Sequence, residues 1–234
     1  MTKRDVALQL LRRGWVLTLG ALAGLVIVYT RVAFFTPIES TQGPAQKIFY
    51  VHVSSAWASL GAFAVTGILS LLYLWRRDRK LDTVAEASAE VGLMFGVIML
   101  TTGPIWGKVV WGTWWDWDAK LTSTLFLFLL FIGYTVLRGA VADLDTRARF
   151  SAVIGVLSLV LVPFIFLSVH MFRTLHPKPP VLRAGGPSMP AAMLITLLFS
   201  VFVFSVLYVG FVTLRYALAV LKELRAEEAA HGIS

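Results

Sequence analysis

Six long stretches without a charged residue limit the folds that this sequence can adopt. Each is rich in apolar side chains, and they cover residues 14–30, 48–75, 91–107, 121–137, 150–172 and 184–214. A helix needs about 20 such residues to cross the hydrocarbon core of a bilayer, and flanking apolar residues extend the shorter stretches to this length. The runs are continuous and lack the period-2 alternation of barrel strands, so they predict membrane-spanning helices.

The composition supports the same fold class. Of the 234 residues, 58% are hydrophobic and only 15% are charged, whereas a soluble domain has about 25% charged residues. This excludes most classes of water-soluble protein. We therefore expect an all-α polytopic membrane protein that forms one domain over residues 1–234. Its six transmembrane helices are expected at about 14–35, 50–75, 88–106, 120–138, 150–170 and 190–214.

The distribution of basic residues predicts the orientation. Fourteen of the 21 Lys and Arg residues lie at the two termini and in the loops after the second and fourth spans, and seven lie on the other side. By the positive-inside rule, both termini are cytoplasmic, and the loops 36–49, 106–118 and 172–190 face outward. The apolar run continues to Tyr29, which favours a retained first span over a cleaved secretory signal.

Tryptophan is concentrated in one outward loop, residues 106–118. This loop holds five of the eight tryptophans, whereas Trp15, Trp57 and Trp75 are scattered singly. An interfacial aromatic belt would be shared among all span ends, so the cluster favours a functional role over an anchoring one. The five clustered tryptophans are Trp106, Trp111, Trp114, Trp115 and Trp117.

The spacing of these residues indicates the kind of ligand. If residues 111–118 are helical, Trp111, Trp114, Trp115 and Asp118 project from one side. Such an aromatic surface suits a large, flat, amphipathic ligand, of which a porphyrin and a quinone ring are examples. Asp118 also has a purely structural alternative, as the N-cap of the fourth span.

Histidine distinguishes between these ligands. His52 lies at the outer end of the second span and His176 just outside the fifth, on the side that carries the tryptophans. A pair of neutral imidazoles is a standard axial ligand set for haem iron. His170, at the end of the fifth span, is a competing candidate that could be core, a supporting residue or the ligand itself. His231 lies in the tail and is expected to be solvated.

Haem also carries two propionates, which need cations or backbone donors. The outer side supplies five candidates: Lys47, Lys108, Lys120, Arg173 and Arg183. Most are expected to snorkel at span ends, and Lys47 and Lys120 are distinguished by their proximity in sequence to His52 and Asp118. The net charge of +8 divides equally between the two sides, which fits an anionic ligand better than nucleic acid. The chain has no cysteine, so disulfides, thiolate metal sites and thioether attachment of haem through a C-x-x-C-H motif are excluded.

A resemblance to a known family rests on these residues. The segment 111–123, with the sequence WGTWWDWDAKLTS, resembles the tryptophan-rich WWD signature of the haem-handling proteins of cytochrome c maturation. It is most similar to the haem exporter protein C family, CcmC, because its WDAKLTS ending and the chain length differ from the larger CcmF and CcsA proteins. The similarity covers nearly the whole chain and includes His52 in YVHV and His176 in TLHP.

The resemblance implies a function. In this family, non-covalent haem b is held at the periplasmic face of the bacterial inner membrane by two axial histidines, which map onto His52 and His176. The haem passes to the chaperone CcmE, with CcmD and the ABC transporter subunits CcmA and CcmB as further partners. The family's haem platform and chaperone docking surface map onto six residues: Trp106, Trp111, Trp114, Trp115, Trp117 and Asp118. Propionate contacts are expected from Lys47, Lys120 and Arg173. Two positions depart from the family pattern, Met171-Phe172 and Asp116.

Two other functions remain open from the residues themselves. A small permease would be expected to have broken helices and ionisable residues at mid-membrane; Pro104 and Pro163 would allow kinks, but no charged residue lies mid-span. A quinol-linked membrane cytochrome would place its histidine pairs within the spans. Residues 103–109 do not match a P-loop, so the chain is expected to hydrolyse no ATP and not to be an enzyme, although the family promotes the loading of haem onto its chaperone.

Overall fold

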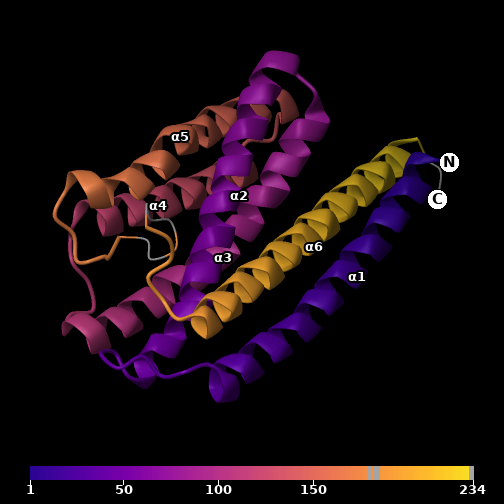
Figure 1. Cartoon of the computed structure of the whole chain (residues 1–234). Coiled ribbons are helices and arrows are strands. Elements are labelled where there is room, and N and C mark those ends of the chain that lie inside the picture. Colours follow the sequence, from indigo (N-terminus) through magenta and orange to yellow (C-terminus); the bar gives the residue numbers. More distant parts are fainter. Residues whose placement is uncertain (179–180, 182–184, 232–234) are drawn as a thin grey trace.

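The computed structural model is a bundle of six long helices, and it describes residues 1–178, 181 and 185–231 (Figure 1). The helices are α1 (Lys3–Thr30), α2 (Ile48–Arg76), α3 (Arg79–Trp111), α4 (Ala119–Ala140), α5 (Leu144–Met171) and α6 (Ala191–Ala230). A π-helical turn (Arg31–Phe35) extends α1, and a 3-10 turn (Pro44–Lys47) precedes α2. All six helices are long and apolar enough to span a membrane. The all-α, six-span prediction is therefore confirmed.

Several helices extend beyond the spans expected from the sequence. α1 begins at Lys3 rather than near residue 14, and α6 continues to Ala230 rather than ending near residue 214. Charged residues mark where a chain leaves the hydrocarbon core, but they are good helix formers and do not end a helix. The ends are set by caps instead. Asp143, for example, accepts a hydrogen bond from the backbone N–H of Thr146 at 2.8 Å at the start of α5.

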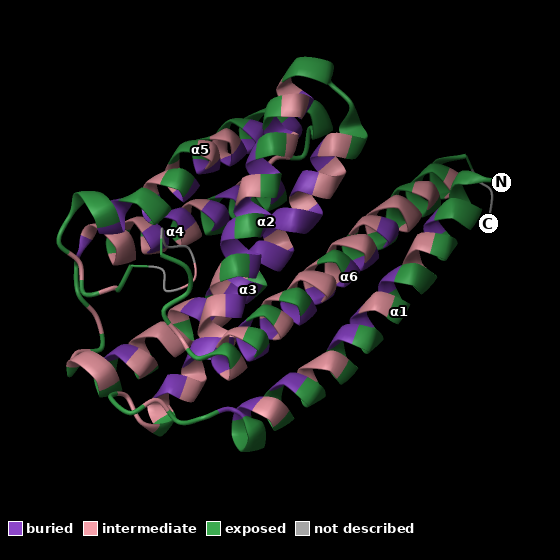
Figure 2. Cartoon of the chain, viewed as in Figure 1, coloured by how far each residue is buried: buried purple, intermediate pink, exposed green. Residues whose placement is uncertain are grey.

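α2 is the central helix of the larger part of the bundle, which consists of α2, α3, α4 and α5. It packs against α3 and α5 along its length and also touches α6. Small side chains allow the close approach, as where the Ser158 hydroxyl of α5 donates to the Phe63 carbonyl of α2 at 2.8 Å. The Phe63 ring stacks on Phe131 of α4 with centroids 3.9 Å apart. Buried positions therefore concentrate between these helices (Figure 2).

α1 and α6 form a second, antiparallel pair. Glycines bring them together: a Cβ added at Gly14 would lie 2.8 Å from the side chain of Leu214, and one at Gly210 would lie 2.7 Å from the Thr18 hydroxyl. Figure 1 shows this pair diverging from α2 and α3 toward the two termini. α6 connects the two parts through a hydrogen bond of 2.8 Å between the Tyr208 and Ser88 hydroxyls.

The end of the bundle that holds the α2–α3 turn contains a buried ion network. Arg138 of α4 donates to both carboxylate oxygens of Asp82, at 2.7 and 3.0 Å, and to Glu86 at 2.7 Å. The Arg138 and Asp82 side chains are 4% and 8% exposed. Since a buried charge is tolerated only when it is paired, this network fixes α4 against α3 at the end opposite the tryptophan-rich loop.

Candidate functional site

Residues 112–118 of the tryptophan-rich loop are not helical, so the condition under which Trp111, Trp114, Trp115 and Asp118 would share one helix face is not met. α3 ends at Trp111, and the chain runs without regular structure until α4 begins at Ala119. Gly112 ends the helix because its φ of 78° lies in the left-handed region, which glycine adopts without a steric penalty. Trp111 therefore stays on α3, while the later tryptophans lie on an extended segment.

The exposure of the tryptophans differs along this segment. Trp114 and Trp117 are 59% and 74% exposed, whereas Trp111 and Trp115 are partly buried. The indole rings of Trp115 and Trp117 form an edge-to-face pair with centroids 5.9 Å apart. The indole N–H of Trp115 is buried and has no hydrogen-bond partner in the described part of the chain, which leaves it able to bind an acceptor on a ligand.

His52 is held between α2 and α3. Its Nδ1 lies 3.1 Å from the Thr102 hydroxyl, and that hydroxyl donates its own hydrogen to the Ile98 carbonyl at 2.7 Å. Since Thr102 has a single hydrogen to donate, it accepts from His52, and Nδ1 carries the proton. The lone pair of the imidazole is therefore on Nε2, the arrangement of a histidine prepared to bind a metal.

His176 lies on a loop and has the same protonation pattern as His52. Its Nδ1 lies 3.0 Å from the carbonyl oxygen of Pro177. A carbonyl can only accept, so Nδ1 is again the protonated nitrogen and Nε2 carries the lone pair. Burial lowers the pKa of His176 to about 4, and the charge of Lys120 acts in the same direction. His176 is therefore neutral at pH 7, the form that binds a metal.

Asp118 anchors the loop that carries His176. One carboxylate oxygen accepts from the backbone N–H of Leu121 at 2.8 Å and caps α4. The other accepts from the Thr174 hydroxyl and from the backbone N–H of Leu175 at 3.1 Å, and the Thr174 hydroxyl accepts from the N–H of His176 at 3.1 Å. The N-cap role is thus present, together with a second role that the sequence did not indicate. With the residue 9% exposed, Asp118 offers little surface for docking.

Two tryptophans of α3 lie beside the two histidines. The Trp106 ring lies 5.8 Å from the His52 ring, and the Trp111 ring lies 6.4 Å from the His176 ring. The last turns of α3 thus bring together side chains from α2, α3 and the loop after α5.

Close packing keeps His52 in place. A Cβ added at Gly103 would lie 3.0 Å from its Cε1 atom, so glycine leaves the space that the imidazole occupies. The Trp106 indole N–H donates to Gln42 at 3.1 Å, which fixes the ring beside His52. Sequence reasoning missed Gln42, Thr102 and Gly103. The signal for Thr102 was its position four residues before Trp106, on the same face of a helix.

The predicted propionate contacts differ in their surroundings. Lys120 is partly buried, and its charge acts on both His52 and His176. Lys47 donates to the Ala33 carbonyl at 2.7 Å, so its ammonium is already engaged. Arg173 is exposed. Lys108, an outer cation considered earlier, donates to the Gly112 carbonyl at 2.9 Å, and Arg183 lies outside the described residues.

The two remaining histidines lie apart from this arrangement. His170 is exposed on the last turn of α5, and no hydrogen bond or ring contact joins it to the site in the described chain. His231 is exposed, with Nδ1 2.7 Å from the Glu227 carbonyl. Within the described ranges, no group of three or more His, Cys, Asp or Glu residues is placed to hold a bare metal ion. Two imidazoles suffice, however, for iron that already has four ring nitrogens as ligands.

Comparison with known proteins gives consistent matches. The family model described as heme exporter protein C matches residues 3–231. Three proteins named "Heme exporter protein C" are similar to this chain. The one from Bradyrhizobium diazoefficiens is 40% identical over 173 residues, 74% of this chain and 66% of that protein, just under two thirds of its length. The one from Haemophilus influenzae is 35% identical, covering 81% of this chain and 77% of its own length. The one from Escherichia coli K12 is 34% identical, covering 70% and 68%.

Proposed function

This chain belongs to the haem exporter protein C family, and on that premise we propose that it binds haem between His52 and His176 and delivers it to the chaperone CcmE. The observation that carries the proposal is the matched state of the two imidazoles. Each donates Nδ1–H to an oxygen of the protein, so each presents the Nε2 lone pair. Outer-shell hydrogen bonds of this kind are typical of histidines that bind metals.

The surroundings of the imidazoles fit the rest of a haem molecule. The indole faces of Trp106 and Trp111 provide apolar area beside them. Lys120 supplies a positive charge close to both histidines, and the unpartnered indole N–H of Trp115 supplies a donor. We assign propionate binding to Lys120 and Trp115 rather than to Lys47, whose ammonium is bound to the Ala33 carbonyl. The bound molecule is haem b, held without a covalent bond.

The mechanism of delivery follows from the supports of the two ligands. His52 belongs to a membrane helix and is packed on Gly103, whereas His176 belongs to a loop that Asp118 anchors through Thr174 and Leu175. A ligand on a loop moves at lower cost than one in a packed helix. In this proposal His176 is the ligand that gives way when an acceptor histidine approaches, and His52 holds its position.

The setting of the site is also part of the proposal. The positive-inside bias supports cytoplasmic termini and an outward site, which in a bacterial inner membrane faces the periplasm. The exposed tryptophans Trp114 and Trp117 then form the surface that docks CcmE. CcmD, CcmA and CcmB are the proposed further partners, and ATP hydrolysis is assigned to the transporter subunits. The chain itself acts as a carrier rather than as an enzyme.

Transfer of haem to the chaperone tests this function. His52→Ala and His176→Ala should each abolish the formation of haem-loaded CcmE in cells that express the complete maturation system. His170→Ala is the matched control, because this exposed histidine at the same end of the bundle should leave transfer unchanged. Normal loading by either ligand variant would refute the proposal. Sustained quinol oxidation by the isolated chain would instead identify a membrane cytochrome.

A further inference from the structure

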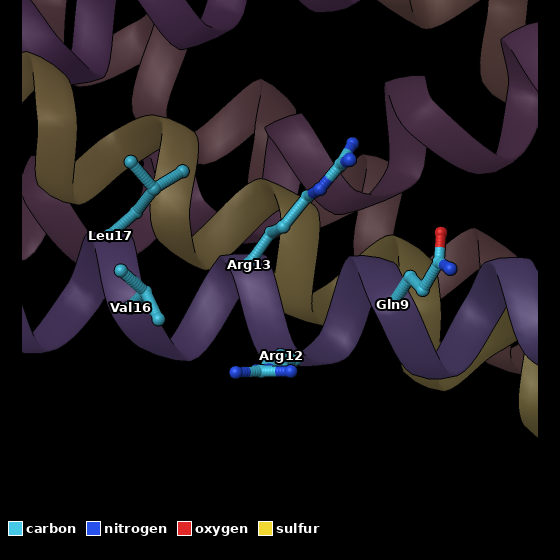
Figure 3. Close-up of a pocket in the computed structure, with 5 residues that line it drawn as sticks. All are labelled: Gln9, Arg12, Arg13, Val16 and Leu17. Carbon is cyan, nitrogen blue, oxygen red and sulfur yellow. The ribbon is translucent and has the colours of Figure 1, made fainter.

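A cavity of about 540 Å³ lies along α1, at the end of the bundle opposite the tryptophan-rich loop. Among the residues that the structure describes, those lining it come from α1: Gln9, Arg12, Arg13, Val16 and Leu17 (Figure 3). In this view Gln9, Arg13 and Leu17 extend from the same side of the helix. α1 contacts α6 through buried residues that include Gly14 and Thr18, and Leu17 lies at the edge of this contact, because a Cβ added at Gly210 of α6 would lie 3.3 Å from the Leu17 Cβ. The cavity is therefore an open groove that runs beside the contact between α1 and α6.

The polarity of the groove changes along the helix axis. Gln9, Arg12 and Arg13 are polar, and Val16 and Leu17 are apolar. The first charge-free stretch begins directly after Arg13, so the arginines lie at the boundary between headgroups and hydrocarbon. One helical turn, about 5 Å, separates them from the apolar part. This order matches a molecule with an anionic head and a hydrocarbon chain.

The two guanidinium groups are free to bind a ligand. Neither Arg12 nor Arg13 forms a hydrogen bond or ion pair with any residue that the structure describes. Other arginines at the same end are paired: Arg138 contacts Asp82 and Glu86, and Arg215 contacts Glu90. An arginine that only extends its charge to the membrane surface needs no cavity beside it. A planar guanidinium that borders a cavity can bind a phosphate there through two parallel hydrogen bonds.

We propose that this groove binds one anionic phospholipid, with its phosphate against Arg13, an acyl chain against Val16 and Leu17, and Arg12 adding positive charge at the same level from the neighbouring side of the helix. Basic pockets between transmembrane helices are recognised sites for anionic headgroups. The site is separate from the haem site and does not depend on the proposed function. A lipid bound at this site would cover the exposed side of the α1–α6 pair.

Lipid retention tests the proposal. The full chain is released from bilayers that contain equal amounts of phosphatidylglycerol and phosphatidylcholine, and the bound lipid is measured by native mass spectrometry. The unmodified chain should retain phosphatidylglycerol in preference. Arg12→Gln with Arg13→Gln should lower that retention about tenfold or more, since each basic residue near the surface contributes about fivefold to binding of an anionic lipid.

Two further variants make the result specific. Lys80→Gln with Arg149→Gln is the matched control: both residues are exposed, lie at the same end and remove the same charge, so retention should be unchanged. Val16→Trp keeps both arginines but fills the apolar part of the groove, and it should also reduce retention. Equal retention of the two lipids, no retention of either, or an equal loss in the control would overturn the proposal.

Discussion

The two halves of the candidate haem site achieve the same chemistry on different supports. His52 sits in the second turn of α2, and its Nδ1–H is bound by Thr102 of the neighbouring helix. His176 sits on a loop, and its Nδ1–H is bound by the carbonyl of the next residue, Pro177. The first arrangement depends on the packing of two helices. The second depends on one carboxylate, Asp118, that joins the loop to the start of α4.

In the proposed function, this difference would let one chain both hold haem and release it. Two rigid ligands would hold haem firmly but would resist exchange with an acceptor. Two loop ligands would exchange readily but would pay a larger ordering cost on binding. One ligand on a helix and one on a loop combine a ligand that stays in place with a ligand that can be exchanged.

Asp118→Ala should produce the largest effect, because it frees the His176 loop. We expect haem affinity to fall about 10- to 100-fold, the range typical for loss of an outer-shell partner, measured by haem titration. The helix cap is lost as well, at a cost of about 1 kcal/mol in stability. Asp143→Ala is the matched control: it removes the N-cap of α5, far from the site. If both variants bind haem equally well, Asp118 does not position His176.

Thr102→Val should weaken the other half. The valine keeps the shape of threonine but removes the hydroxyl oxygen beside Nδ1 of His52, so the imidazole loses one of the contacts that fix its tautomer. We expect about a tenfold loss of haem affinity, with the His176 side unchanged. Thr101→Val provides the comparison, because within the described part of the chain the Thr101 hydroxyl hydrogen-bonds to the Val97 carbonyl of its own helix and to no residue of the site. Similar losses in the two variants would contradict a role for the Thr102 contact.

Lys120→Gln should have a smaller effect that is shared by both halves. Its charge acts on both imidazoles, and in our account it binds a propionate. The expected loss of haem affinity is about three- to tenfold, within the range of one charged hydrogen bond. Lys47→Gln should change the affinity little, since that ammonium already binds the Ala33 carbonyl. The reverse order of effects would reassign the propionate contact to Lys47.

Much of the fold could be predicted because the length of a stretch without charged residues can be measured directly in the sequence. The six helices, the tryptophan-rich loop and the placement of His52 and His176 at span ends all follow from it. The local conformation of residues 111–118 did not follow from it: Gly112, in a left-handed conformation, caps α3 after Trp111. The side-chain spacing did not indicate it, although glycine is the residue most often found at a helix end.

The supporting contacts of the site could not be predicted, because they join distant parts of the chain. Asp118 and Thr174 are 56 residues apart, and His52 and Thr102 are 50 residues apart. Each pair depends on how the helices pack, which hydropathy does not encode. The sequence therefore indicated the two candidate ligands but not the residues that support their tautomers and positions.

Ligation of haem iron by both imidazoles is the central claim, and electron paramagnetic resonance of the purified, ferric haem-loaded chain tests it most directly. The unmodified chain should give a low-spin signal with two imidazole ligands. His52→Gly and His176→Gly should each convert it to a high-spin signal, and added imidazole should restore the low-spin form. A low-spin signal that survives either substitution without added imidazole would contradict the account.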